Sequence, residues 1–415
     1  MNSVSSFTWK TLDFIAKEHG DSYYLLDLEK FKSNYSGFIG AFRRFYPKTY
    51  VAYSYKTNYT PAICRLADSL GALSEVVSGM EFGMARSLGV SVSKVVFNGP
   101  YKKQETVERV VLGDGMVHLD SLRDVRSIEL IARQHSEKRI KIGLRCNFDI
   151  GEDLESRFGF DVESDSFQDV LRRIDAIPNV DINGIHCHFP NRNIESFVAR
   201  IEKMLEINRG CFGDNLDYIN IGGGYFGNMS EYLKSQFGNH VPSYEEYARE
   251  IGSRISTHFA GVAEDKCPML ILEPGSALVA DTMVFISRVV STKRIGCRNI
   301  ATIAGSSFNI AATTGNKKLP MSLIKPNAET FVEEPEFDIG GYTCIESDYV
   351  ARGFKGNVEE GDFVLFDNVG SYSVVMKPPF ILPNIAILQV GDEESGFKVV
   401  KRAETADDVF ATYVR

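Results

Sequence analysis

Lys56 stands where a lysine could carry out covalent chemistry. It closes residues 49–55, a run that mixes aromatic and small side chains without a charge and therefore predicts a buried strand. Desolvation at the end of such a strand favours the neutral amine of Lys56. A neutral amine can attack an aldehyde and form a Schiff base. A structural lysine whose ammonium reaches out of the strand end is the alternative on this stretch alone.

Two further motifs follow apolar runs and suggest a site for a phosphorylated ring. Residues 222–224 are three consecutive glycines whose unhindered backbone N–H groups could cradle a phosphate, with a flexible loop as the alternative. His186 and His188 lie two residues apart, but no acidic or thiol partner follows at the spacing of a metal site. We therefore expect no metal here, and His188 could instead lie flat against an aromatic cofactor.

Glu273 and Cys344 add a carboxylate and a thiol in positions that suggest chemistry. Glu273 ends an apolar run, where a buried carboxylate needs a partner. A protonated pyridine nitrogen would be such a partner, and the carboxylate would keep the ring cationic and a good electron sink. Cys344 lies among polar residues, where a reactive thiol would be found, although a lone cysteine is commonly a small core residue.

About eight alternations of strand and helix must position these residues. They begin at Tyr50 and extend over roughly 230 residues, which fits a closed parallel (β/α)8 barrel better than an open sheet. In barrel enzymes the chemistry lies at the carboxyl ends of the strands. The predicted strand ends are unusually polar here: Lys56, Glu75, Ser78, Asn98, Arg145, His186, His188, the glycines 222–224 and Glu273.

The pattern changes after Asp281. Helical patterns nearly vanish, and β-rich runs such as residues 283–292 and 362–367 follow. We therefore expect an α/β chain with a TIM-type barrel over residues 30–282. Residues 1–29 and 283–415 are expected to form a mostly antiparallel β domain, because the strand predicted at 23–26 precedes the barrel.

The composition is that of a soluble globular protein and excludes several classes of function. The chain has 415 residues, of which 44% are hydrophobic and 24% charged, so two domains are expected. A net charge of −9 argues against a nucleic-acid partner. No run is long enough to span a membrane, and no signal peptide is visible. Seven dispersed cysteines suit a reducing compartment, with the cytoplasm as the default.

Together the motifs resemble those of the fold-type III pyridoxal-phosphate decarboxylases, the ornithine, arginine and diaminopimelate decarboxylase family. The resemblance runs from about residue 22 to about residue 390, in the family's order. It implies the cofactor pyridoxal 5′-phosphate (PLP), an amino-acid-type substrate and lyase chemistry. It also implies a head-to-tail homodimer whose active sites are shared between the subunits.

The resemblance implies cofactor roles for residues of the barrel. Lys56 matches the lysine that forms the Schiff base, and His188 matches the histidine stacked on the cofactor ring. Glu273 matches the partner of the pyridinium nitrogen. The phosphate turn corresponds to Gly222, Gly223 and Gly224. An acidic-x-x-Ser-x-x-Glu strand end beside the cofactor corresponds to Glu75, Ser78 and Glu81.

The resemblance also implies roles for the β domain. Tyr372 matches a tyrosine that reaches the phosphate. Cys344 matches the cysteine that crosses from the partner subunit and protonates Cα after carbon dioxide leaves. Asp348 matches an aspartate that lies near the distal end of the substrate in the diamine enzymes.

The departures from the family bear on the substrate. Diaminopimelate enzymes have Arg where this chain has Ser276, and Glu directly after the cysteine, where this chain has Ile345 and an acid only at Glu346. Residues 190–192 read Pro-Asn-Arg where Gly-Ser-Gln is usual. Because a site that pairs both ends of its substrate discriminates strongly, diaminopimelate is disfavoured. Residues 305–309 resemble a divergent branch with decarboxylases of siderophore and other specialised pathways.

We therefore expect PLP-dependent decarboxylation of an amino acid or an amino-acid conjugate. The expected substrate contacts are Asp348, Glu346, Ser276 and Arg192, the last with solvated surface as the alternative. The alternative hypotheses are a racemase on the same fold and a catalytically inactive regulator. Lys56 and Cys344 could formally serve a racemase, whereas the retention of the full residue set argues against a regulator.

Overall fold

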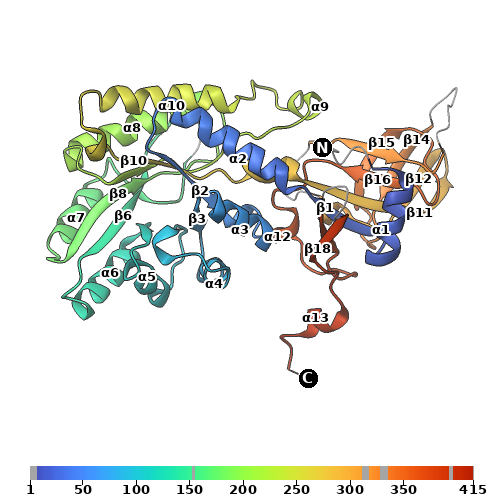
Figure 1. Ribbon diagram of the computed structural model, residues 1–415, viewed down its shortest axis with the longest axis horizontal. Coiled ribbons are helices and arrows are strands. Elements are labelled where there is room, and N and C mark those ends of the chain that lie inside the picture. The colour runs from blue at the N-terminus through green and yellow to red at the C-terminus, as the bar shows by residue number, and fades with distance from the viewer. Residues whose placement is uncertain (1–6, 152–154, 311–316, 328–334, 392–395, 415) are drawn as a thin grey trace. The chain divides into compact units, whose positions relative to one another are not determined.

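The computed structural model describes residues 7–151, 155–310, 317–327, 335–391 and 396–414 (Figure 1). By its internal contacts the chain divides into two units. The barrel unit comprises Lys32–Gly227 and Asn239–Leu278. The β unit comprises Met1–Phe31, Asn228–Gly238 and Val279–Arg415.

Eight parallel strands form the barrel unit's sheet, and pairing of β5 with β6 and of β10 with β2 closes it. The strands are short, buried and nearly free of charge, as expected for strands covered on both sides. The expected (β/α)8 barrel is confirmed. Its strands are β2 (Thr49–Ser54), β3 (Leu73–Val76), β4 (Val95–Phe97), β5 (Met116–Leu119), β6 (Ile140–Asn147), β8 (Val180–His186), β9 (Tyr218–Asn220) and β10 (Met269–Leu272), with the two-residue β7 (Phe160–Asp161) beside β6.

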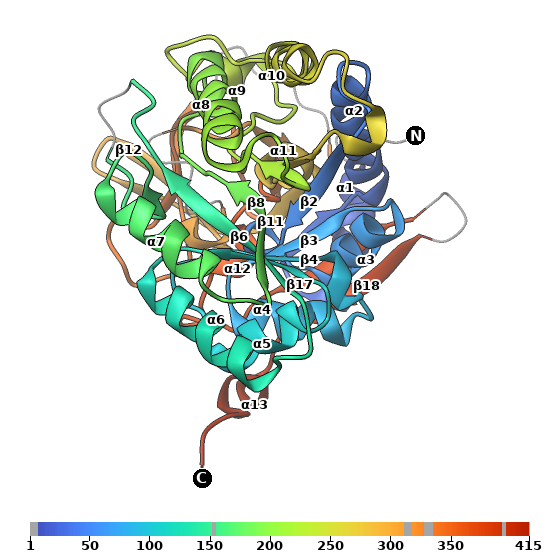
Figure 2. The ribbon, with the colours of Figure 1, turned by 90° about the vertical axis from the view of Figure 1, so that its left-hand side faces the viewer.

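Amphipathic helices surround these strands, as the view onto the barrel shows (Figure 2). Pro61 opens α3 at its first turn, where a missing N–H costs nothing. Ser78 caps α4 by accepting a hydrogen bond from the Glu81 N–H. The helices are α2 (Leu28–Arg43), which begins in the β unit, α3 (Pro61–Ser69), α4 (Gly79–Ser87), α5 (Gln104–Val111), α6 (Leu122–Gln134), α7 (Asp165–Asp175), α8 (Ile194–Phe212) and α10 (Tyr244–His258).

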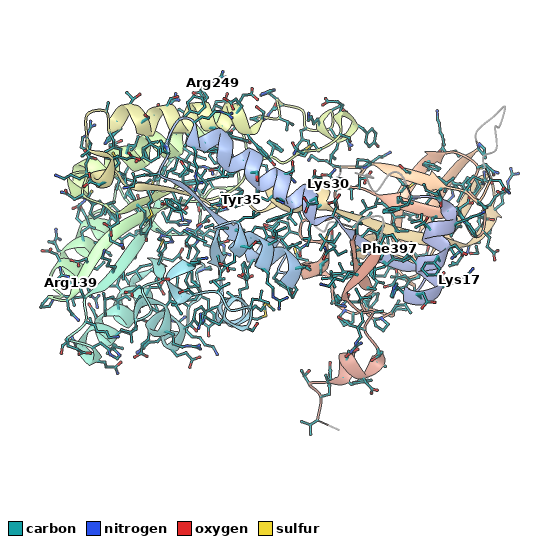
Figure 3. All side chains as sticks on the ribbon, viewed as in Figure 1. Lys17, Lys30, Tyr35, Arg139, Arg249 and Phe397 are labelled. Carbon is teal, nitrogen blue, oxygen red and sulfur yellow. The ribbon has the colours of Figure 1, made fainter. Side chains whose placement is uncertain are left out.

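The two ends of the barrel differ in character. At the amino ends of the strands, Arg139, which Figure 3 labels, pairs with Asp181, and Lys141 pairs with Asp217. These partners are largely exposed, so each pair contributes at most about 1 kcal/mol. The buried polar groups gather instead at the carboxyl ends.

The β unit contains a nine-stranded sheet within the described residues. Most neighbours pair antiparallel, as expected, but β1 with β17 and β12 with β14 are parallel. The strands are β1 (Ser22–Leu26), β11 (Met283–Ile295), β12 (Arg298–Ile303), β13 (Met321–Ile324), β14 (Glu336–Gly340), β15 (Tyr349–Lys355), β16 (Phe363–Phe366), β17 (Ala386–Val390) and β18 (Phe397–Lys401). The helices are α1 (Trp9–His19), α9 (Glu231–Lys234), α11 (Ser276–Val279), which begins in the barrel unit, α12 (Ser373–Met376) and α13 (Ala406–Phe410).

Alternate residues of four neighbouring strands build the core of the β unit. Every second side chain faces one side of a strand, so β1, β11, β16 and β17 each contribute two residues to one buried cluster. Helix α1 completes it. The members are Leu12, Ile15, Ala16, Tyr23, Leu25, Val284, Ile286, Phe363, Leu365, Ala386 and Leu388. The early strand β1 therefore belongs to this sheet, as expected.

All seven cysteines are free of disulfides. Within the described residues, no helix combines the length and the apolar character required to cross a membrane.

Two glycines allow a test of how tightly the barrel is packed, one in a barrel strand and one in a surrounding helix. A Cβ on Gly184 in β8 would lie 2.1 Å from the ring of Tyr218, which is fully buried. We expect Gly184→Ala to lower the unfolding free energy by about 1–3 kcal/mol, because overpacking forces the strand or the ring to shift. A Cβ on Gly210 in α8 meets nothing within 4 Å, so Gly210→Ala should leave the melting temperature unchanged or raise it. Equal thermal melts of the two variants would contradict this.

Candidate active site

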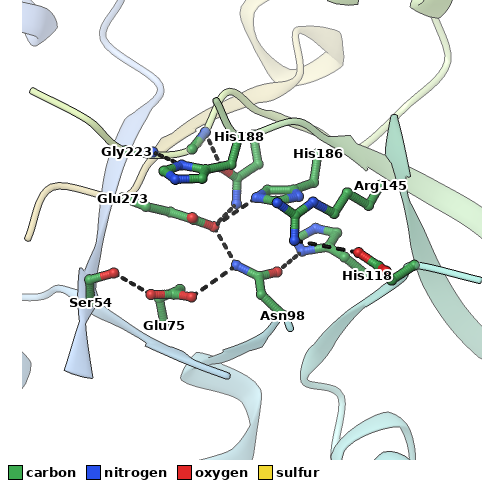
Figure 4. Close-up of polar contacts among 12 residues, drawn as sticks. Ser54, Glu75, Asn98, His118, Arg145, His186, His188, Gly223 and Glu273 are labelled. Carbon is green, nitrogen blue, oxygen red and sulfur yellow. Dashed lines mark hydrogen bonds and ion pairs between the residues drawn. The ribbon is translucent and has the colours of Figure 1, made fainter. Parts of the chain in front are cut away.

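Glu273 lies at the centre of the polar groups at the carboxyl end of the barrel (Figure 4). Its side chain is only 3% exposed, and it directly follows β10. One carboxylate oxygen, Oε1, accepts hydrogen bonds from the amides of Asn98 at 2.7 Å and Asn220 at 2.8 Å. Among the described residues, the second oxygen has no hydrogen-bond partner. The carboxylate is therefore oriented by neutral donors and retains an acceptor for a further group.

Two stacked histidines lie beside Glu273 and are both neutral. The rings of His118 and His186 are 4.7 Å apart and 17° from parallel. Burial lowers the pKa of both well below 6.5, and the cation of Arg145 lowers that of His186 further. Nε2 of His186 is 3.4 Å from the Glu273 carboxylate without a hydrogen bond between them. No imidazolium therefore neutralises Glu273.

Lys56 lies in a helical turn, Tyr55–Thr57, directly after β2. Its Nζ is 2.6 Å from the carboxylate of Glu75, which is fully buried. The hydroxyl of Ser54 donates to the same Glu75 oxygen. The Lys56 side chain is 33% exposed. Lys56 is therefore ion-paired and partly open, and thus less buried than the sequence predicts.

Asn98 connects the two carboxylates. Its amide group lies 3.3 Å from Glu75 and 2.7 Å from Glu273, while its oxygen accepts the proton of His118 Nδ1. Sequence reasoning placed Asn98 at a strand end but gave it no role. Asn220, the last residue of β9, and His118, within β5, were missed entirely.

The glycine turn is tightly built. Gly222 and Gly224 have φ values of +70° and +106°, which disfavour other residues. A Cβ on Gly223 would lie 2.3 Å from the carbonyl oxygen of Glu273. The Gly222 N–H donates to Asn220, and the Gly223 N–H donates to Nδ1 of His188 at 3.1 Å. The expectation of three unhindered donors is therefore wrong; within the described residues, the N–H of Gly224 is the one without a partner.

His188 is a neutral ring next to this turn. Nδ1 accepts from Gly223, so Nε2 carries the proton. Burial lowers the pKa of His188 well below 6.5, and the cations of Lys56 and Arg200 add to the effect. A neutral aromatic ring that is fixed in this way suits stacking against another ring.

The two candidate substrate residues of the barrel unit differ in accessibility. Ser276 is the first residue of α11 and is half-buried. The guanidinium of Arg192 lies 5.3 Å from the ring centre of Phe226 and makes no ion pair within the described residues. Arg192 is half-buried, so its charge is available to an anion.

The β unit carries the remaining candidates. Cys344 and Glu346 are exposed in the loop before β15, and Glu346 has no ion-pair partner in the described part of the chain. Asp348 is buried, and its two oxygens accept from Ser306, Ser307 and Thr343. Although burial alone would raise the pKa of Asp348, these hydrogen bonds outweigh it and the pKa is lowered. Asp348 therefore fastens its own loop through these hydrogen bonds, and its expected contact with a substrate stays a prediction.

Tyr372 has a strained backbone. Its φ of +59° places it in the left-handed region, which is uncommon for an aromatic residue. It directly precedes α12, and the Ser371 hydroxyl next to it is buried without a partner. Strain of this kind is commonly retained where a side chain has a function.

The barrel rim fits a phosphate-bearing pyridine. A carboxylate with a vacant acceptor suits a protonated ring nitrogen, a neutral histidine suits the ring face, and a turn that only glycine can form suits the phosphate. Lys56 supplies the amine for an aldehyde. Within the described residues, no group of three or more side chains could hold a metal ion.

Comparison with known proteins agrees with this fit. The model of the pyridoxal binding domain of pyridoxal-dependent decarboxylases matches residues 37–280. Diaminopimelate decarboxylase from Methanocaldococcus jannaschii is 27% identical over 381 residues, 87% of this chain and 84% of that protein. The Pseudomonas fluorescens enzyme of that name is 24% identical over 96% of this chain and 94% of its own. The crystal structure of the M. jannaschii enzyme has a TM-score of 0.83, with 24% identity, 97% of this chain covered and 94% of that one.

The chain belongs to the pyridoxal-dependent decarboxylase family. It is a PLP-dependent amino-acid decarboxylase, and the expected fold class, cofactor and enzyme class are confirmed.

The neutral histidines predict a pH dependence of stability. Below pH 6.5 the unfolded chain binds protons at His118, His186 and His188 that the folded barrel excludes. The unfolding free energy should therefore fall as pH decreases below 6.5, by up to about 1.4 kcal/mol per pH unit for each histidine. Thermal melts of the cofactor-free protein between pH 5 and 7.5 should show this loss.

The variant His118→Asn provides the control, because it keeps a donor for Asn98 and removes one titrating group. Its melting temperature should decrease less steeply with falling pH than that of the wild type. An unchanged slope would show that His118 does not contribute.

Proposed function

We propose that this enzyme removes the carboxylate from the α-carbon of an amino acid or amino-acid conjugate that is not diaminopimelate by preference. The observation that carries the proposal is the set of groups around Glu273, with Lys56, His188 and the glycine turn at the same end of the barrel. We further propose that the substrate belongs to a specialised pathway. The seven free cysteines support a cytoplasmic location.

The barrel residues bind and orient the cofactor in this proposal. Lys56 would hold PLP through its amine, and Glu75, whose carboxylate lies 2.6 Å from Nζ, could take or return the proton of that amine. Glu273 would pair with the ring nitrogen and keep it protonated, and His188 would stack on the ring. Bound PLP supplies the sink for the electron pair released when the bond between Cα and the carboxylate breaks.

Cys344 returns a proton to Cα from the partner subunit in this proposal. Asp348 contributes by holding the loop of Cys344 through Ser306, Ser307 and Thr343. Tyr372 would reach the cofactor phosphate, as the family resemblance implies.

An apolar surface next to Cys344 supports the homodimer. Ile345 directly follows Cys344 and is 37% exposed, and Phe380 and Ile381 are 41% and 54% exposed. The hydroxyl of Tyr342 donates to the Phe380 carbonyl, so the segment around Phe380 lies beside the Cys344 loop. An exposed apolar patch of this kind commonly marks a protein interface.

The substrate preference rests on changed positions around a retained site. Ser276 and Ile345 lack the charges that diaminopimelate enzymes use for the distal amino acid group. Arg192 lies over Phe226 without a carboxylate partner among the described residues, and we assign it to an anionic distal group of the substrate. The relatives are named diaminopimelate decarboxylases at 24–27% identity, which leaves room for a different substrate.

Release of carbon dioxide from a substrate panel tests this proposal. The panel contains meso-diaminopimelate, lysine, ornithine, arginine, simple amino acids and amino acids conjugated to a carboxylate. We expect the highest kcat/KM for a substrate with a distal anion, and Arg192→Met should lower that value about tenfold or more. Preference for diaminopimelate would refute the substrate assignment. Racemisation of the substrate without release of carbon dioxide would indicate a racemase. A purified protein without a visible absorption band of the cofactor would indicate a regulator.

Mixing two inactive variants tests the shared active site. Lys56→Ala should lose both turnover and the borohydride-fixed cofactor. Cys344→Ala should still bind the cofactor covalently after borohydride treatment. It should form little of the normal product, because the proton is added at the wrong position. If each site combines Lys56 of one subunit with Cys344 of the other, reassorted mixtures should recover roughly a quarter of the wild-type rate, since half of the dimers hold one intact site of two. No recovery between folded, exchanging variants would contradict shared sites, and Cys211→Ala is the matched control.

A further inference from the structure

Arg200 in α8 is fully buried and lies against the glycine turn. Its guanidinium donates to the carbonyl of Gly223 at 2.9 Å and to the carbonyls of Phe189 at 3.0 Å and Asn191. The hydroxyl of Ser196, one helical turn earlier, accepts from it as well. The buried guanidinium therefore connects the helix to two separate loop segments.

The guanidinium also places a positive charge next to the turn. Removing a guanidinium from water is costly, and hydrogen bonds offset part of that cost. The five hydrogen bonds to Ser196 and the three carbonyls go to neutral acceptors. The ring of Phe197, 4.1 Å from the guanidinium, adds a cation–π contact. A bound anion close to this guanidinium would gain from its positive charge.

The geometry of the peptide bond indicates where such an anion would lie. In a trans peptide the C=O and the N–H point in opposite directions. The Gly223 carbonyl shares its peptide unit with the Gly224 N–H. Because Arg200 holds that carbonyl, the N–H of Gly224 points away from Arg200. This N–H is also the donor of the turn that has no partner within the described residues.

Arg200 fixes the other side of the turn too. Its contacts with Phe189 and Asn191 hold the segment that follows His188. His188 in turn accepts the N–H of Gly223. The guanidinium thus stabilises both the turn and the histidine beside it.

We propose that Arg200 is a positioning residue of the phosphate site, which aims the Gly224 N–H at the phosphate and adds positive charge behind the glycine turn. The inference rests on the proposed role of residues 222–224 in holding PLP. Arg200 acts through Gly223 and contacts no phosphate oxygen itself.

Cofactor binding to the apoenzyme tests this role. The dissociation constants of PLP and of pyridoxal, which has the aldehyde and the ring but no phosphate, are measured by absorbance titration. Arg200→Met should weaken PLP binding about tenfold or more and leave pyridoxal binding within about twofold. Arg200→Lys, which keeps the charge but not the planar fork, should lie in between. Arg209→Met removes an exposed arginine from the same helix and should bind both compounds as the wild type does.

The possible outcomes are distinct. If Arg200→Met binds PLP with the affinity of the wild type, the proposal is overturned. An equal loss of affinity for PLP and for pyridoxal would also overturn it, because it indicates a general packing role. If Arg200→Met does not fold, Arg200→Lys decides by the same two criteria. A wild-type protein that binds no PLP would refute the proposed function itself, independently of Arg200.

Discussion

The buried carboxylate of Glu273 is the constraint on which the rest of the barrel rim depends. A carboxylate that is 3% exposed is costly unless its oxygens are satisfied. The protein provides two amide donors from Asn98 and Asn220, which orient the group without neutralising it. A lysine or arginine in place of either asparagine would have formed a permanent ion pair with Glu273. With neutral donors, Glu273 is left able to pair with a cationic ring, as the proposed function requires.

The neutrality of the neighbouring histidines follows from the same constraint. Because His118 is uncharged and donates from Nδ1 to the oxygen of Asn98, the amide group of Asn98 must face Glu273 and Glu75. An imidazolium at His186 would pair with Glu273 and would compete with the ring nitrogen of the proposed function, but burial opposes its protonation. The orientation of Glu273 is therefore set by a chain of hydrogen bonds that begins at His118.

The sequence predicted the barrel well, because buried parallel strands appear as short uncharged runs between amphipathic helices. It also identified Lys56, Glu273 and the glycine turn as chemically significant. It could not show how those groups are satisfied. Asn98, Asn220 and Glu273 meet only when the barrel closes. Arg200 resembles an ordinary polar residue of an amphipathic helix, and nothing in its neighbours indicates complete burial.

Local hydrogen bonds occupy polar groups at several positions that the sequence singled out. Two of the three glycine N–H groups are used inside the rim, and Asp348 is used by its own loop. Residues that match a motif can thus also use their polar groups inside the protein. Within the described residues, the side chains of Ser276 and Arg192 belong to no such buried network. In the proposed function, substrate preference therefore changes at these positions while the cofactor chemistry is retained.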